Sequence, residues 1–242
     1  MYDKFNKAVG ISLIAFFLAG LTPALADRQV WSTRTGDWFV IANWTNTTTP
    51  ADTRVPADGD DVVVTNLGAF VYLPNSTARL SFMVISNAYV SCSNWDTTVY
   101  VTKLTILKSG VLTCAGPFTN NVMSNRVSLN CTTLVIETNG SINVQGKGYS
   151  GGVGPSYAKG NGPGAAAGIR GAGYGGYGVQ GQFSGSLTNT YGSATAPLDP
   201  GSGSNGGSEI GSMGGSGGGA VCITAVQVVV NGSISANGSP RF

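Results

Sequence analysis

One residue pattern occurs four times in this chain, and it constrains the fold more strongly than any other feature of the sequence. Each copy reads apolar-x-apolar, then a polar pair around a small residue, then a second short alternating stretch. Alternation at every second residue is typical of β-strands with one buried face, so each copy predicts two short strands joined by a tight corner. The copies are residues 82–92, 104–114, 134–144 and 226–236.

The corner residue is small in every copy: Ala88, Gly110, Gly140 and Gly232. Ser-Gly at 109–110 and Asn-Gly at 139–140 and 231–232 are typical of turns with a left-handed backbone. We therefore predict that these dipeptides supply the left-handed conformation at the corners.

The spacing of the copies predicts a solenoid. Successive copies begin 22, 30 and 92 residues apart. A step of 22 residues is too short for a strand-helix-strand crossover with its loops, but it suffices for one coil of short strands that pair in parallel with the next coil. The longer steps are then coils with insertions, which leave a solenoid at one corner. The sequence therefore predicts an all-β parallel β-helix.

The longest insertion, residues 146–219, holds 27 of the 37 glycines. No helical pattern and no P-loop Lys-Ser/Thr follows its Gly-x-Gly patches, so a nucleotide site is not expected. Two interpretations stay open, a flexible surface loop or an ordered flap along the β-helix. Its aromatic residues favour partial order, and tyrosines among Gly and Ser suit contact with sugars or proteins. The candidate ligand-binding residues are Tyr149, Tyr157, Tyr174, Tyr177 and Tyr191.

The region before the first repeat, residues 27–75, contains the tryptophans Trp31, Trp38 and Trp44. An open β-helix end would expose unpaired strand edges and an apolar interior. We therefore interpret this region as a cap with the first strands. The alternative is a platform on which sugars stack.

Parts of the chain resemble secreted bacterial glycine-rich right-handed parallel β-helix proteins, a group with adhesins and autotransporter-like passengers. In that group an opening GxW…NW…P-x-x-GD-x-V-x-I stretch precedes coils of the form NGxIxxxG and a re-entry strand SGGGAVxI. The resemblance covers most of residues 27–242, and it implies architecture rather than activity. The coil and re-entry motifs match residues 139–146, 231–238 and 216–223, and the opening matches Gly36, Trp38, Asn43, Trp44, Pro56, Gly59, Asp60, Val62 and Val64.

The two ends of the chain complete the expected organisation. Residues 1–26 read as a signal peptide, with Lys4 and Lys7 before an apolar run at 8–21 and cleavage before Asp27. That run is shorter than the roughly 20 residues that span a bilayer, and none follows, so we expect no transmembrane helix in the mature chain. We expect β-helix coils at 76–145 and a further coil at 220–242.

The sequence shows no cap after the last coil. We therefore expect that the chain is a fragment of a longer protein, or that a capping partner or another copy stacks there.

Composition narrows the function. Histidine is absent, which excludes catalysis by Ser-His-Asp or Cys-His groups of this chain. Charged residues make up only 10% and form no basic stripe, so nucleic acid is not expected as a partner. The one acidic cluster, Asp58, Asp60 and Asp61, is a turn-to-strand junction in one interpretation and a calcium site in the other.

The cysteines Cys92, Cys114, Cys131 and Cys222 form no CxxC pair, which argues against a zinc site. In an exported chain an even number favours disulfides, with three connectivities open. Cys92 and Cys114 occupy the same place in consecutive copies, which puts their backbones about 4.8 Å apart and within disulfide range. The alternative is buried free thiols.

Taken together, these features predict a secreted or cell-surface structural or adhesive β-helix protein without catalytic activity. The alternative is a carbohydrate-binding or polysaccharide-degrading, lyase-like β-helix protein, which would need clustered carboxylates. In either case the expected partners are polysaccharides or cell-surface components.

Overall fold

The computed structural model describes residues 26–165, 171–174, 189–193 and 195–240. Within these residues the regular structure is β, apart from one short 3-10 helix, η1 (Ile41–Asn43). The described part contains no helix of the length and apolarity that crossing a membrane requires. The strands are β1 (Arg28–Trp31), β2 (Thr35–Asp37), β3 (Trp44–Asn46), β4 (Asp61–Val64), β5 (Ala69–Leu73), β6 (Leu80–Ile85), β7 (Ala88–Cys92), β8 (Val99–Ile106), β9 (Val111–Cys114), β10 (Val127–Ile136), β11 (Ser141–Asn143), β12 (Val221–Thr224), β13 (Gln227–Val230) and β14 (Ser233–Ser235).

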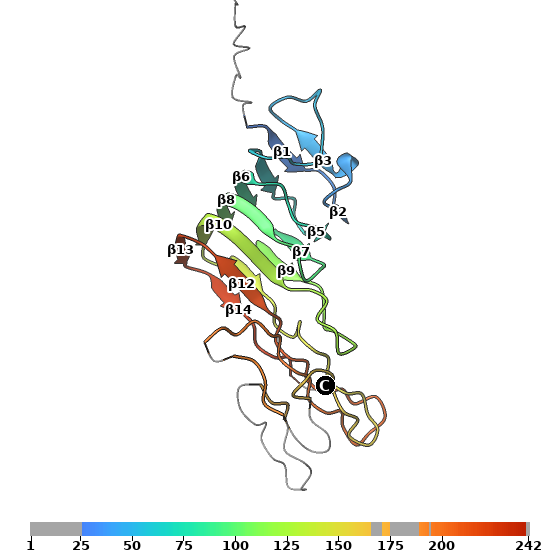
Figure 1. The fold of residues 1–242 in the computed structure, drawn as a ribbon. Coiled ribbons are helices and arrows are strands. Elements are labelled where there is room, and N and C mark those ends of the chain that lie inside the picture. The colour runs from blue at the N-terminus through green and yellow to red at the C-terminus, as the bar shows by residue number, and fades with distance from the viewer. Residues whose placement is uncertain (1–25, 166–170, 175–188, 194, 241–242) are drawn as a thin grey trace, which may run out of the picture.

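These strands form two mostly parallel sheets (Figure 1). The first sheet has the order β12-β10-β8-β6-β4-β1-β3, and β13 also pairs with β10. The second has the order β14-β11-β9-β7-β5-β2. From β4 to β11 the chain alternates between the sheets, and every pair of neighbouring strands is parallel except β1 with β3. The prediction of an all-β protein with parallel pairing is confirmed.

The strand register follows the sequence repeat. The four copies become the strand pairs β6–β7, β8–β9, β10–β11 and β13–β14. Leu104 of β8 pairs in register with Leu134 of β10, which in turn pairs with Val228 of β13. Insertions between the copies therefore leave the stacking of equivalent residues unchanged.

The core lies between the two sheets and consists of stacked apolar side chains. In the first sheet Ile85, Ile106 and Ile136 occupy equivalent positions, and each is fully buried. In the second sheet Leu112 and Ile142 repeat the arrangement. Alternation at every second residue places this set on the inner face of each sheet, as the sequence predicts.

At each of two corners between the sheets, one residue adopts the left-handed backbone and the next leaves no space for a Cβ. The left-handed backbone belongs to Ser109 and Asn139, whose φ angles are 56° and 64°. The following glycine is needed for space instead, because a Cβ at Gly140 would lie 2.5 Å from the carbonyl oxygen of Ile106 in the preceding coil. The predicted left-handed corner is therefore confirmed for these two dipeptides, and the glycine is required by close backbone approach. It is wrong for Asn231 and Gly232, neither of which has a positive φ; a Cβ at Gly232 would lie 2.2 Å from the carbonyl oxygen of Gly140.

A cluster of three tryptophans closes the N-terminal end. Trp31, Trp38 and Trp44 are buried, and Trp44 packs edge-on against both others at ring-centroid distances of 5.1 and 4.7 Å. The Trp44 indole N–H donates to the carbonyl oxygen of Trp38 at 2.6 Å. At the same end of the fold, β3 pairs antiparallel with β1 and is the last strand of the first sheet. The burial of all three rings favours the interpretation as a cap over that of a sugar platform.

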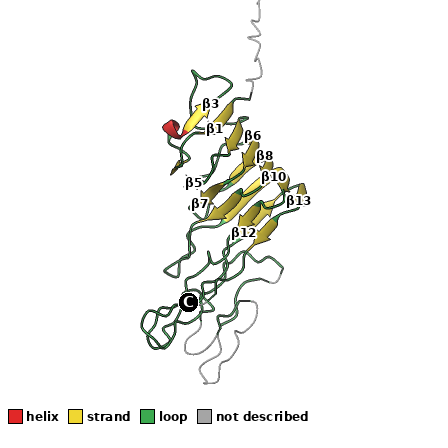
Figure 2. Ribbon diagram, turned by 180° about the vertical axis from the view of Figure 1, so that it is seen from behind, coloured by secondary structure: helices red, strands yellow, loops and turns green. Residues whose placement is uncertain are grey.

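The described glycine-rich residues 147–165 and 199–219, here called the glycine bundle, are cross-linked by backbone hydrogen bonds. Gly148 N–H donates to the carbonyl of Gly217, and Gly203 N–H donates to that of Asn161, both at 2.9 Å. These segments lie side by side without forming strands and appear as loops beyond the sheets in Figure 2. A Cβ at Gly160 would lie 2.5 Å from the carbonyl oxygen of Gly203. These contacts favour the ordered flap over the flexible loop for the described part of the insertion.

Candidate functional site

The outer face of the second sheet carries a row of aromatic rings. Phe70 and Tyr72 project from β5, and Tyr89 projects from the neighbouring β7 in register with Phe70. The Phe70 and Tyr89 rings stack at 5.8 Å with an angle of 19° between their planes, and Tyr72 lies 4.9 Å from Phe70. Tyr72 and Tyr89 are 46% and 42% exposed, so the row presents open aromatic surface.

Short polar side chains continue the same face beyond the aromatic row. Ser91 of β7 pairs in register with Thr113 of β9, and Asn143 of β11 follows on the next strand. The Thr113 hydroxyl donates to the carbonyl oxygen of Asn143 at 2.6 Å, which fixes its rotamer. These residues form an uncharged floor, in which Ser91 and Thr113 are only 3% and 7% exposed.

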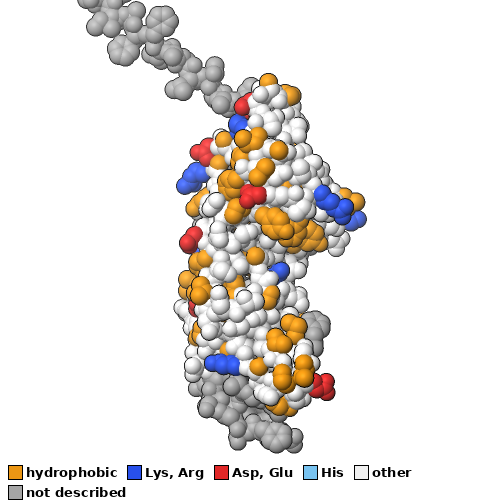
Figure 3. All heavy atoms as spheres, turned by 90° about the vertical axis from the view of Figure 1, so that its right-hand side faces the viewer, with side chains coloured by type: hydrophobic (Ala, Val, Ile, Leu, Met, Phe, Trp, Pro, Cys, Tyr) orange, Lys and Arg blue, Asp and Glu red, His pale blue; other side chains and the backbone are white. Residues whose placement is uncertain are grey.

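The aromatic row and the polar floor line one groove of about 550 Å³, here called the aromatic groove. The groove is also lined by Gln145, by Lys147 at the start of the glycine bundle, and by Ser239. Lys147 is the one charged residue among the described residues that line it. No salt bridge involving Lys147 forms within the described residues. Figure 3 views the molecule from the side on which β2, β5, β7 and β9 lie in Figure 1, where charged side chains of both signs are scattered among apolar and uncharged polar ones.

The predicted tyrosine site is not assembled as one surface. Tyr149 is buried against Phe118, with the ring centroids 5.2 Å apart. Tyr191 donates from its hydroxyl to the carbonyl oxygen of Pro200 at 2.6 Å, and burial raises its pKa to about 12. Both rings therefore stabilise the glycine bundle. Tyr157 is half-buried with a φ of 56°, and Tyr177 lies outside the described residues.

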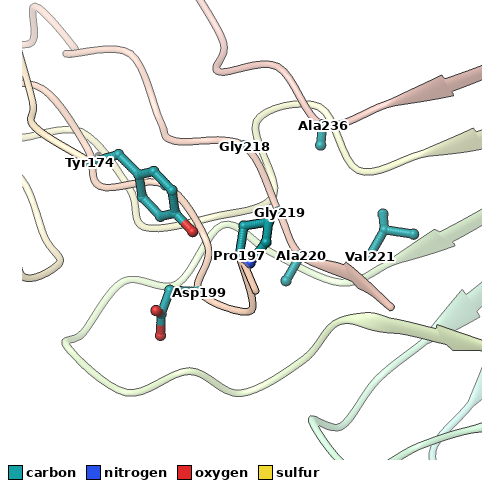
Figure 4. Close-up of a pocket in the computed structure, with 9 residues that line it drawn as sticks. Tyr174, Pro197, Asp199, Gly218, Gly219, Ala220, Val221 and Ala236 are labelled. Carbon is teal, nitrogen blue, oxygen red and sulfur yellow. The ribbon is translucent and has the colours of Figure 1, made fainter. Parts of the chain in front are cut away.

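Tyr174 borders a second cavity, of about 360 Å³, between the glycine bundle and the last strands. Its ring packs edge-on against Tyr191 at 4.8 Å, and in Figure 4 its hydroxyl points toward the segment that carries Pro197 and Asp199. The rest of the lining is mostly glycine and alanine, including Ala236. This cavity offers few side-chain groups to a ligand, so the aromatic groove is the stronger candidate site.

The three carboxylates proposed for calcium point to different partners. Asp60 is buried and accepts hydrogen bonds from Arg54 through both oxygens, one of them at 3.0 Å. Asp61 lies 3.9 Å from Arg28, and Asp58 accepts from the backbone N–H of Arg79 at 2.7 Å. No group of three potential metal-binding side chains forms within the described residues. The arrangement therefore favours the interpretation of this turn as a turn-to-strand junction. The positive charge beside Asp60 is the guanidinium of Arg54 rather than a metal ion.

Arg54 also joins the start of the fold to this turn. Its guanidinium lies 3.0 Å from the Asp27 carboxylate and 3.1 Å from that of Asp52. The hydrogen bond to Asp60 raises the pKa of Arg54 above its usual range. Asp27 is the first residue after the predicted cleavage site.

All four cysteines lie in the described residues, and each is a free thiol. Cys92 and Cys114 are register partners on β7 and β9, as predicted, but no disulfide joins them. In-register parallel strands hold their side chains side by side, about 4.8 Å apart, rather than pointing toward each other. Burial raises the pKa of both thiols to about 12. The predicted disulfide is thus not seen; Cys92, Cys114 and Cys131 are buried free thiols, as in the alternative, and Cys222 is half-buried.

These thiols predict a loss of stability at alkaline pH. The folded state raises the pKa of Cys92 and Cys114, so the unfolded chain loses these protons at a lower pH than the folded chain does. The free energy of unfolding therefore has its full value below about pH 9 and falls as the pH rises toward 12. Urea unfolding at several pH values should show this decline, and Cys92→Val should make it shallower. Thiol titration in denaturant without reductant should give four free groups, and a lower count would contradict the free-thiol state.

Comparison of the chain with protein-family models, curated proteins and solved structures finds no match. The resemblance to secreted bacterial β-helix proteins therefore stays a prediction. The aromatic groove was missed by sequence reasoning, although a signal was present: Phe70, Tyr72 and Tyr89 stand at the outward positions of alternating strands, where polar residues are usual.

Proposed function

We propose that this chain is an exported, non-catalytic adhesive protein that binds carbohydrate in the aromatic groove. The observation that carries the proposal is the row Phe70, Tyr72 and Tyr89 beside the polar floor of Ser91 and Thr113. Aromatic faces pack against the C–H faces of sugar rings, and hydroxyl and amide groups bond to sugar hydroxyls. A rigid row built on neighbouring strands holds such contacts in fixed positions.

The scaffold of this proposal is a parallel β-helix. Alternation of the chain between two parallel sheets, a constant register and a tight corner in each copy support it. A solenoid suits an adhesive role because stacked coils hold a long face rigidly, while insertions add surfaces at one corner. The glycine bundle is such an addition and contributes Lys147 to the lining of the groove.

Export is supported by the predicted signal peptide and by the contacts of Asp27. The Asp27 carbonyl accepts from the N–H of Asp61 at 2.8 Å, and its carboxylate accepts from the Thr49 hydroxyl at 3.0 Å. Ala26, just before it, is exposed. Cleavage before Asp27 would leave these contacts intact, so residues 27–242 are proposed as the secreted or cell-surface form.

The proposal predicts that aromatic substitutions in the groove weaken sugar binding. Residues 27–242 would be screened against immobilised neutral and acidic glycans, and the best ligand titrated by calorimetry. Tyr72→Ala and Tyr89→Ala should each weaken binding roughly tenfold, which corresponds to about 1.4 kcal/mol of stacking. Tyr100→Ala is the matched control, because Tyr100 projects from β8 of the other sheet.

Two results would contradict the proposal. If the chain bound no glycan class, carbohydrate would not be its ligand. If Tyr72→Ala and Tyr89→Ala both left the affinity unchanged, the glycan would bind outside the aromatic groove. Release of shorter fragments from a bound polysaccharide would instead favour the lyase-like alternative.

A further inference from the structure

One row of register positions on the outer face of the second sheet passes through the aromatic groove. Asp37 of β2 pairs in register with Tyr72 of β5, and Tyr72 pairs with Ser91 of β7. Ser91 pairs with Thr113 of β9, whose hydroxyl donates to the carbonyl oxygen of Asn143 on β11. Because neighbouring strands lie about 4.8 Å apart, these four strand spacings extend over roughly 19 Å. An oligosaccharide that follows the row would therefore contact several strands.

The two ends of this row carry opposite charges. Asp37 lies at one end, one strand beyond Tyr72, and one of its carboxylate oxygens accepts from the backbone N–H of Phe39 at 2.7 Å. At the other end the chain leaves β11 at Asn143 and reaches Lys147 four residues later. Lys147 lines the groove, and Asp37 does not. An anionic ligand is therefore attracted toward the Lys147 end of the groove and repelled from the Asp37 end.

The protein does not neutralise the charge of Lys147. None of the salt bridges among the described residues includes it, although every Asp and Glu after residue 26 lies in the described part of the chain. The described residues that line the groove include no carboxylate. Burial raises the pKa of Cys114, and the charge of Lys147 partly offsets this rise, so the ammonium lies close to another residue of the lining. The groove thus contains a positive charge that is available to a ligand.

The fold holds Lys147 in a fixed place. Its backbone N–H donates to the carbonyl oxygen of Val144 at 3.1 Å. The N–H of the following residue, Gly148, donates to the carbonyl oxygen of Gly217 at 2.9 Å. The start of the lysine side chain packs on the glycine bundle, because a Cβ at Gly219 would lie 2.9 Å from the Cβ of Lys147. A side chain that is already partly ordered loses less conformational entropy when it binds a ligand.

We propose that the aromatic groove selects acidic oligosaccharides over neutral ones, and that the anionic group of the bound sugar forms an ion pair with Lys147. This inference rests on the proposed carbohydrate function and adds the class of ligand to it. The rings of Tyr72 and Tyr89 pack against sugar rings, and Lys147 binds the acidic substituent. A carboxylate and a sulfate share this chemistry, since a lysine ammonium is a compact point charge without a fixed binding geometry.

Matched pairs of oligosaccharides test the selection by calorimetry on residues 27–242. Hexamers of galacturonic acid and of glucuronic acid are each compared with their methyl esters, and a sulfated galactan hexamer is compared with its desulfated form. In the pairs that bind, the acidic member should bind about fivefold more tightly, the upper end of what one accessible ion pair contributes. The ratio should decline as the salt concentration rises, because salt screens accessible charges. A preference within the carboxylated pairs alone, or within the sulfated pair alone, supports the proposal and identifies the anionic group.

Substitutions assign the preference to Lys147. Lys147→Gln should abolish the difference between acidic and neutral members, whereas Lys147→Arg should retain it because the charge is kept. Lys103→Gln is the matched control, since it removes the same charge from β8 of the other sheet. It should leave the ratio unchanged. Far-UV circular dichroism checks that the variants remain folded.

Equal binding of acidic and neutral members, or a preference that persists in Lys147→Gln, would overturn the proposal. If both members bound equally and Tyr72→Ala weakened both, carbohydrate binding in the groove would stand and only the acidic preference would fail. If no member of any pair bound, the carbohydrate function itself would fail, and this inference with it.

Discussion

Gly140→Ala is expected to destabilise the protein by about 3 kcal/mol, because the added Cβ would meet backbone rather than a movable side chain. It would lie 2.5 Å from the carbonyl oxygen of Ile106 and 2.9 Å from that of Leu107, both in the preceding coil. Relief of this contact requires the two coils to separate at the corner, where Ile106 and Ile136 stack in register. Urea unfolding followed by circular dichroism measures the change.

Gly68→Ala is the matched comparison for Gly140→Ala. Gly68 also lies in a turn between strands, but a Cβ there meets nothing within 4 Å, and its φ is +72°. Its substitution should therefore cost only the left-handed backbone penalty, about 1 kcal/mol. Equal costs at the two positions would contradict the close approach of neighbouring coils.

Trp44→Ala is expected to cost about 4 kcal/mol, the range of large aromatic truncations in a core. Trp44 packs against Trp31 and Trp38, and its indole N–H donates to the carbonyl of Trp38. Its removal leaves a cavity at the end of the stack and an unsatisfied carbonyl. Thermal or urea unfolding measures the loss, and Phe39→Ala, at a 38% exposed ring nearby, should change stability little.

The same variant separates the two interpretations of the tryptophan cluster. A cap predicts a large loss of stability with sugar affinity retained in the folded fraction. A loss of sugar affinity with unchanged stability would instead support the stacking platform and contradict the buried arrangement.

The stacked strands were predictable because their signal is periodic. Residues such as Leu104 and Leu134 stand at the same place in each copy, and the parallel register follows directly from that equivalence. The corner chemistry was predictable in part. The sequence predicts a turn at Asn139 and Gly140. Only the structure shows that Asn139 has the left-handed backbone and that Gly140 makes the close contact.

The order of the glycine bundle was harder to predict from sequence. Its stability comes from backbone bonds between residues about 50 positions apart, such as Tyr149 with Gly201, and such bonds leave no hydrophobic period. The calcium hypothesis also arose because the relevant contact leaves no distinctive pattern in the sequence. The carboxylate of Asp60 has its partner in Arg54, six residues earlier, and charge spacing alone does not distinguish an ion pair from a metal site.

The aromatic groove depends on residues from separate coils and from the base of the glycine bundle. Phe70, Tyr89 and Lys147 come together only through the parallel register and the path of the insertion. A single strand shows no more than one or two outward aromatics, which are common on protein surfaces. The site could therefore be recognised only after the strands were placed.

Carbohydrate binding in the aromatic groove is tested by mapping a bound glycan onto residues 27–242 through amide chemical-shift changes in NMR spectra. We predict that the largest changes fall on residues 70–72, 89–91 and 111–113, together with 143–147. Changes centred on Tyr157 or Tyr174, or no changes with any glycan at millimolar concentration, would contradict carbohydrate binding in the aromatic groove.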